Sequence, residues 1–292
     1  MSRKKRQAVQ GILYILPSFI LLAAFSIIPI FMTVYYSFTD YNMMRAPQLV
    51  GLSNYQRVFH DSYMAAAFKN TLVYTAVTVP IQTVASLAIA AFFAAKLQKK
   101  GGEFLRSVMF IPVIASAITA ATIWRIIFAT DGGILNTFLG LFGASKVNWL
   151  GDSDVALISI CIVAIWKNIG YFMVIYYAGI MAIPKDLYEA ATIDGASTMQ
   201  EFFRITLPLL KPITYLVVTL GIIWSFQVFD LSYQMTGGGP GKSTVTLVMG
   251  IYNSAFKQYK MGYASAIAIL LLVLILVINL VENLFFKEKE AA

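Results

Sequence analysis

Long stretches without a charged residue recur along this chain, and they constrain its fold more than any other feature. No Asp, Glu, Lys or Arg lies between Gln7 and Thr39, and similar stretches follow. About 18 or more consecutive apolar residues can cross a bilayer as one helix. Only 12% of the residues are charged, whereas roughly 25% is usual in a soluble domain. The pattern therefore predicts several membrane-spanning helices instead of one soluble core.

We expect six spans, and the predicted fold class is an all-α membrane protein with a single transmembrane domain over residues 1–292. Each span can cross a hydrocarbon core of ~30 Å at ~1.5 Å per residue. The first span follows the basic segment Arg3–Arg6 and is much longer than the ~7–15 apolar residues of a signal peptide, so we expect it to be retained. The expected spans are about 12–38, 70–95, 107–129, 155–182, 213–229 and 261–286.

Basic residues are unevenly divided between the two sides that six spans would define. The segments 1–10, 96–106, 183–212 and 287–292 hold 13 Lys and Arg in 57 residues. The alternate segments 40–69, 125–154 and 230–260 hold 8 in 91. Because short loops rich in Lys and Arg stay in the cytoplasm, both termini are predicted to be cytoplasmic.

Single occurrences of cysteine and histidine exclude several kinds of site. Cys161 is the only cysteine and His60 the only histidine. An intramolecular disulfide and a zinc site with several Cys or His ligands are therefore impossible within one chain. We find no convincing catalytic constellation, so the sequence argues against a membrane-embedded enzyme.

The segment 183–212 is predicted to be a helix–turn–helix on the cytoplasmic face. Pro184 stands at a plausible first helical position, and Asp186 and Glu189 follow where the helix dipole favours acids. Gly195 lies where a helix would end in a left-handed residue.

A second short helix is expected directly after this turn. Ser197 with Gln200, or Thr198 with Glu201, offers a capping box at its start. Pro208 and Pro212 then end or kink the helix before the fifth span.

The same segment carries a resemblance to a known family. Glu189-Ala190-Ala191, Gly195 and Ile205-Thr206-Leu207-Pro208 have the spacing of the EAA loop of binding-protein-dependent ABC importer permeases. The resemblance covers nearly the whole chain and is closest to the maltose-type sugar permeases. Two further segments are similar to that group: Phe229-Asp230 with Thr236–Pro240, and Gly51–Tyr55.

The resemblance implies that this loop couples the chain to an ATPase. The residues expected to take part are Glu189, Ala190, Ala191, Gly195, Ile205, Leu207 and Pro208. Small residues allow a close backbone approach, and an acidic side chain can pair with a basic partner. The alternative is an amphipathic helix that lies at the membrane interface and needs no partner.

The family also implies the partners and the location. We expect a prokaryotic inner-membrane complex with a second, homologous permease, two ATPase subunits or domains and an extracytoplasmic binding protein that delivers a sugar. This chain would contact lipid but no nucleic acid. It would hold no cofactor, because ATP and Mg²⁺ would be bound by the ATPase.

One glycine-rich segment looks like a phosphate-binding loop. Thr236–Ser243 ends in Gly241-Lys242-Ser243, but the first glycine of the P-loop pattern is replaced by Thr236. The pattern also requires a preceding strand in a soluble domain. We therefore interpret this segment as an external turn between two spans.

Polar and aromatic residues within the fourth and fifth spans are candidates for the substrate path. Such groups are costly in a membrane and usually face a cavity or a partner helix. Amides and hydroxyls could bind a sugar, and aromatic rings could stack on it. The candidates are Lys167, Asn168, Tyr171, Trp224, Ser225 and Gln227.

Structural roles remain open for some of these candidates. Lys167 could pair with Asp230 or extend to the interface, and Asn168 could join two helices. Lys167 also leaves an anionic substrate such as glycerol phosphate open. A different class, an ion-gradient-driven transporter, would need inverted repeats or paired acids, and we find neither.

Overall fold

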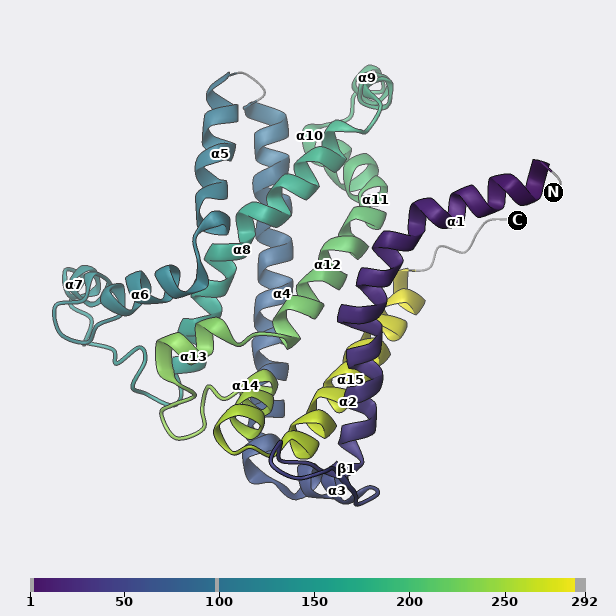
Figure 1. Ribbon diagram of the computed structural model, residues 1–292. Coiled ribbons are helices and arrows are strands. Elements are labelled where there is room, and N and C mark those ends of the chain that lie inside the picture. Colours follow the sequence, from purple (N-terminus) through teal and green to yellow (C-terminus); the bar gives the residue numbers. More distant parts are fainter. Residues whose placement is uncertain (1–2, 98–99, 287–292) are drawn as a thin grey trace. The chain divides into compact units, whose positions relative to one another are not determined.

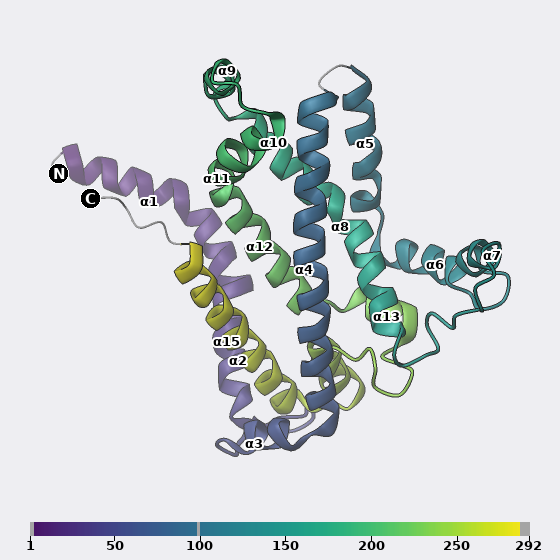
Figure 2. The ribbon, with the colours of Figure 1, turned by 180° about the vertical axis from the view of Figure 1, so that it is seen from behind.

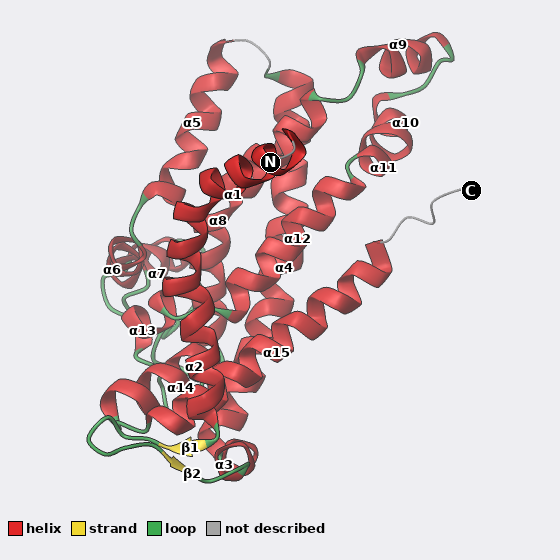
Figure 3. Cartoon of the chain, turned by 45° about the vertical axis from the view of Figure 1, so that its right-hand side comes forward, coloured by secondary structure: helices red, strands yellow, loops and turns green. Residues whose placement is uncertain are grey.

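The computed structural model describes residues 3–97 and 100–286 and divides into two compact units, which are described one at a time. The first unit comprises Met1–Asp61 and Gly250–Leu272. The second comprises Ser62–Met249 and Val273–Ala292. Figures 1 and 3 show that helices make up most of the described chain, as the uncharged stretches predict.

The first unit begins with one long helical stretch. It consists of α1 (Arg3–Leu22), a π-helical turn η1 (Ala23–Ile27) and α2 (Ile28–Ser37). Pro29 lacks the N–H that an α-helix would bond to the carbonyl of Phe25, and the wide turn lies just before it. The stretch Gly11–Ser37 is long and apolar enough to cross a membrane.

A small hairpin follows this helix and packs against the start of the C-terminal helix α15 (Met261–Phe286). Strands β1 (Thr39–Asp40) and β2 (Gln48–Leu49) pair antiparallel, and α3 (Ser53–His60) comes next. The Asn54 amide donates to the carbonyls of Ser37 and Thr39 at 3.0 and 2.9 Å. A Cβ at Gly262 would collide with the Thr39 carbonyl, so only glycine permits this approach.

The second unit is built around α4 (Ser62–Lys96), which runs beside α8 (Ala156–Met181) and α12 (Lys211–Phe226), as Figure 2 shows. Large apolar side chains fill the space between these three helices. One buried cluster contains Ala90, Phe93, Phe172, Met173, Tyr176, Leu210 and Val217.

The span expected at 107–129 is not a straight helix. Helix α5 (Lys100–Ile114) ends inside the apolar stretch, and α6 (Ala117–Ile127) starts after a bend of 97°. The Ser116 hydroxyl accepts from the backbone N–H of Thr119 at 3.1 Å and so caps the new helix. In Figure 1, α6 leaves α5 sideways toward α7 (Ile134–Gly140).

The connection from α6 to α8 is organised by one buried amide. The Asn136 Nδ2 donates to the carbonyls of Ala129, Thr130 and Val147 at 3.4, 3.2 and 2.8 Å. Its Oδ1 accepts from the Val147 N–H and from Trp149 Nε1, at 3.1 and 3.0 Å. Every polar atom of this side chain is therefore used, as burial requires.

The remaining helices complete the chain. They are α13 (Asp230–Thr236), α14 (Leu247–Tyr252), the π-helical turn η3 (Asn253–Lys257) and α15 (Met261–Phe286). Among the described residues, four helices are long and apolar enough to cross a membrane, or six if each of two bent pairs forms one span. An all-α, multi-span membrane fold is therefore confirmed.

Candidate functional site

The segment 183–212 begins with α9 (Lys185–Ile193), which ends at a glycine turn. Gly195 has φ +77°, a conformation that side chains with a Cβ rarely adopt. Its N–H donates to the Thr192 carbonyl at 3.1 Å, and the Ala196 N–H donates to the Ala191 carbonyl at 2.9 Å. These two bonds form a Schellman motif, which satisfies the carbonyls at the end of the helix.

A second short helix, α10 (Thr198–Glu201), starts directly after this turn. Ser197 and Gln200 form its capping box: the Ser197 N–H donates to Gln200 Oε1 at 2.7 Å, and the Gln200 N–H donates to the Ser197 hydroxyl. Of the two boxes that the sequence offers, the structure therefore uses the first.

A π-helical turn joins α10 to the following span. This turn, η2 (Phe202–Thr206), leads into α11 (Leu207–Leu209), and the Leu207 N–H bonds to the carbonyl of Phe202 five residues earlier. The direction then changes by 66° before α12. Pro212 stands in the first turn of α12, after this bend, where a missing N–H costs little. Pro208 follows the π-turn closely, as Pro29 follows η1.

Side-chain bonds tie the two arms of the loop together. The hydroxyls of Tyr188 and Thr206 lie 2.8 Å apart, and Thr206 is buried. The Thr192 hydroxyl donates to Glu201 Oε1 at 3.2 Å.

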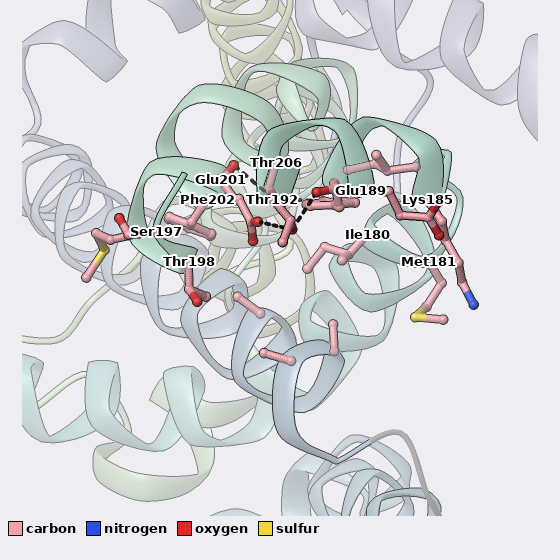
Figure 4. A pocket seen from close by; sticks show the side chains of 16 residues that line it. Ile180, Met181, Lys185, Glu189, Thr192, Ser197, Thr198, Glu201, Phe202 and Thr206 are labelled. Atoms are coloured by element: carbon pink, nitrogen blue, oxygen red, sulfur yellow. Dashed lines mark hydrogen bonds between the residues drawn. The ribbon is translucent and has the colours of Figure 1, made fainter. Parts of the chain in front are cut away.

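A cavity of about 850 Å³ lies between these arms and the ends of α4 and α8 (Figure 4). Its floor is apolar, with Ala91, Ala94, Ala95, Ile180, Met181 and Phe202 among the lining residues.

The outer surface of the loop is open. Glu189 and Ala190 are exposed, and so are the apolar side chains of Leu187, Ile193 and Met199, at 42%, 86% and 65%. Exposed apolar side chains that gather on one loop are typical of a surface that another protein covers.

The other predicted coupling residues differ in burial. Ala191, Ile205 and Leu207 are half-buried, while Pro208 and Gly195 are exposed. The loop therefore leaves Ala190 and the glycine turn exposed, while Glu189 is exposed and also lines the cavity; Ile205 and Leu207, in and beside the π-turn, are more buried.

The glycine-rich segment 236–243 has the form of a turn. It follows helix α13 and not a strand, so the strand–loop–helix arrangement of a P-loop is not formed. Gly237, Gly238 and Gly241 all have positive φ. The Asn70 amide of α4 donates to the carbonyls of Lys242 and Val245 at 2.7 and 3.0 Å and holds the segment in place.

Two of the predicted substrate-path residues come together. The rings of Tyr171 on α8 and Trp224 on α12 lie 5.0 Å apart between centroids, and Phe172 lies 5.4 Å from Trp224. Trp224 is 39% exposed, so the group presents an aromatic surface. Phe172 is fully buried and packs behind these two rings, a contact that its apolar side chain in a span does not reveal from sequence.

The other four candidates have different surroundings. Asn168 is half-buried and Gln227 is exposed. The Ser225 hydroxyl is buried and donates to the Thr78 hydroxyl at 3.1 Å, since Thr78 itself donates to a backbone carbonyl of α4. The Lys167 ammonium donates to main-chain carbonyls near the end of α5. Within the described ranges, no group of three or more His, Cys, Asp or Glu could hold a metal ion.

Comparisons with known proteins place the chain in a family. Residues 67–289 match the family model described as binding-protein-dependent transport system inner membrane component. The probable ABC transporter permease protein YurN of Bacillus subtilis is 36% identical, and the alignment covers 94% of this chain and 95% of that protein. The trehalose/maltose transport system permease protein MalF of Thermococcus litoralis is also 36% identical, over 91% of this chain and 90% of its own length.

The fold agrees with a solved structure. A chain of the bacterial alginate ABC transporter, crystallised in complex with its alginate pentasaccharide-bound periplasmic protein, superposes with a TM-score of 0.84. The two chains are 22% identical, and the match covers 96% of this chain and 94% of the other. The chain therefore belongs to the family of binding-protein-dependent transport system inner membrane components, as a maltose-type permease subunit of an ABC importer.

Proposed function

We propose that this permease carries a carbohydrate, delivered by an extracytoplasmic binding protein, across the cell membrane. The relative from Thermococcus litoralis is named for trehalose and maltose transport, which supports a sugar as the substrate class. The alginate transporter, whose fold is similar, is known in complex with a periplasmic protein that holds an oligosaccharide.

We further propose that the loop 183–212 couples this transport to ATP hydrolysis. The observation that carries the proposal is the form of the loop: an exposed short helix, fixed by a Schellman turn and a capping box, with apolar side chains facing outward. A preformed helix loses little conformational entropy when it docks. Glu189 offers a charge to a basic partner residue, and Ala190 permits close approach.

The remaining parts of the importer follow from this role. A second, homologous permease would complete the translocation path, and two ATPase subunits would bind ATP and Mg²⁺. The loop would face the cytoplasm together with both termini, in agreement with the distribution of Lys and Arg in the sequence.

For the substrate path we propose an aromatic platform with amide donors around it. Tyr171 and Trp224 supply adjacent rings that suit the apolar face of a sugar, and Asn168 and Gln227 supply amides for its hydroxyls. Ser225 and Lys167 lie in the same stretches but bond to α4 and α5. We therefore assign sugar contact to the other four.

The experiment that tests the function is uptake by the reconstituted complex. Vesicles would contain this permease, its partner permease and the ATPase, with the binding protein and a labelled sugar outside and ATP inside. We expect uptake that requires both ATP and the binding protein. An ATPase unable to hydrolyse ATP is the matched control. Uptake driven by a sodium or proton gradient without the ATPase would instead establish a secondary transporter.

A further inference from the structure

Helix α5 ends within an apolar part of the chain, where its last carbonyls need donors. The final four carbonyls of an α-helix have no partner in the helix itself, and in hydrocarbon each unsatisfied group costs several kcal/mol. Here these are the carbonyls of residues 111–114. The Ala115 N–H donates to the Ile111 carbonyl at 3.3 Å, which leaves the following carbonyls to be satisfied from elsewhere.

A lysine on the neighbouring helix supplies that donor. Lys167 lies in the middle of α8, and its Nζ donates to the carbonyl oxygens of Val113 and Pro112 at 3.2 and 3.4 Å. The carbonyl end of a helix carries a partial negative charge, which attracts an ammonium group. Among the described residues, Lys167 has no carboxylate within ion-pair distance. Carbonyl oxygens, and not a carboxylate, therefore meet the charge of Lys167.

Two further residues shape the same place. Gly170, one turn after Lys167 on α8, is buried, and a Cβ there would collide with the Met109 carbonyl of α5. On the other side of the break, Ser116 caps the start of α6. Close packing thus brings the end of α5 onto α8 at the level of Lys167, and the bend of 97° follows immediately.

We propose that Lys167 is a positioning residue that holds the end of α5 against α8 and sets the direction in which α6 leaves. It would act on transport without touching the sugar, by fixing the helix pair beside Tyr171, which lies one turn further along α8. The proposal concerns the geometry of the second unit and depends on the proposed function only for its transport readout.

Spin-label distances test the geometry directly. One label would be placed at Ile126→Cys on α6 and one at Val174→Cys on α8, both exposed positions, with Cys161→Ser as background. We expect one narrow distance distribution for the parent and for Lys167→Arg, because guanidinium also donates to carbonyls. Lys167→Met, which keeps the apolar stem, should give a shifted or broader distribution. Lys69→Met, at an exposed lysine of α4, is the matched control.

Uptake, normalised to assembled complex, provides the second readout. Because Lys167→Met loses charge-assisted hydrogen bonds, its uptake should fall about tenfold or more. Lys167→Arg should keep most of the uptake. If the Met variant does not insert, Lys167→Leu, which also lacks a donor, is measured instead. An unchanged distance distribution in the Met or Leu variant would overturn the proposal. Normal distances with uptake lost only for anionic sugars would assign Lys167 to the substrate instead.

Discussion

Gly195 shows how one residue type can decide a local structure. Its φ of +77° costs an L-residue about 1–2 kcal/mol, although a Cβ at this site would meet no other atom within 4 Å. The cost of replacement is therefore conformational and not steric, and it depends on how well the new residue tolerates the left-handed region.

We expect Gly195→Asp to leave the protein inserted but to reduce its association with the ATPase. The substitution adds strain to the turn and places a negative charge on the proposed docking surface. Gly195→Asn, which has the same shape without the charge and is common at this position of helix ends, should retain more ATPase. Co-purification measures the amount of bound ATPase, and a wild-type amount with the Asp variant would contradict the docking role.

Glu189→Ala should also reduce the amount of ATPase that co-purifies, more weakly if the partner of Glu189 is exposed.

Asn136 gives a residue-scale prediction about stability. In Asn136→Asp the donors to three carbonyls are lost and an acceptor faces them, so the free energy of unfolding should fall by about 1–3 kcal/mol or more. Asn148→Asp is the matched control, since the Asn148 oxygen accepts from Thr130 and Gly151 and an aspartate can still accept. Thermal unfolding in detergent would compare the two variants. Equal stability of both would contradict the role of the buried amide.

Residue-scale predictions from sequence succeed where the interaction is local. The serine and glycine signals of the loop 183–212 act over a few residues, and the structure uses both, whereas Pro184 stands at the N-cap of α9, one residue before the expected helical position. Lys167 and Ser225 differ, because their partners lie 54 and 147 residues away. Their chemistry in a span suggests a role, but packing alone decides what they touch.

At the scale of elements, the straight and the bent spans differ in their signals. The helices α4, α8 and α15 contain long apolar stretches, interrupted in α8 by Lys167, and each is long and apolar enough to cross a membrane; α4 begins at Ser62, before the expected start at 70. The break after α5 depends on the cap that Ser116 provides and on Lys167, which binds the carbonyl end of α5. Ser116 barely changes the hydropathy of the stretch 107–129, and Lys167 lies outside it, on α8. Hydropathy detects apolar length and cannot detect a change of direction.

The pairing of α8 with α12 yields a prediction for transport. Tyr171→Ala removes one ring of the aromatic platform, and Asn168→Ala removes an amide three residues before it. Each loss is worth roughly 0.5–1.5 kcal/mol, so together they should weaken sugar handling by about tenfold to a hundredfold if the terms add. The measurement is uptake that depends on the binding protein, per assembled complex. Unchanged uptake in both variants would remove these residues from the substrate path.

At the scale of the whole molecule, the charge pattern predicts which side each loop faces. A cysteine at Ala190 should react with an impermeant reagent only from the cytoplasm, and one at Lys242 only from outside. Both positions are exposed, and Lys242 avoids the strain that Gly238 would impose at φ +95°. Cys161 would first be replaced by Ser, with transport as the check. Reversed labelling would contradict the orientation and the coupling role of the loop.

Composition and the EAA spacing were sufficient to predict the class, the all-α fold and the family. The division into two compact units was not predictable, because the second segment of the first unit, Gly250–Leu272, ends within helix α15. A continuous apolar helix gives no compositional boundary there. Which side chains surround the cavity beneath the loop likewise depends on three-dimensional packing.

The π-helical turn at Phe202–Thr206 has a consequence for how this protein can change in evolution. The Leu207 N–H bonds to the carbonyl of Phe202, five residues earlier, so the turn contains one residue more than a turn of α-helix. Deleting a single residue here would restore regular winding, and the flanking helices would keep nearly the same faces, because the wide turn already absorbs one extra residue. A deletion in a regular α-helix would instead rotate everything before it by about 100° around the helix axis. Descendants of this sequence should therefore tolerate the loss of one residue at this turn more readily than a deletion in the regular part of α12.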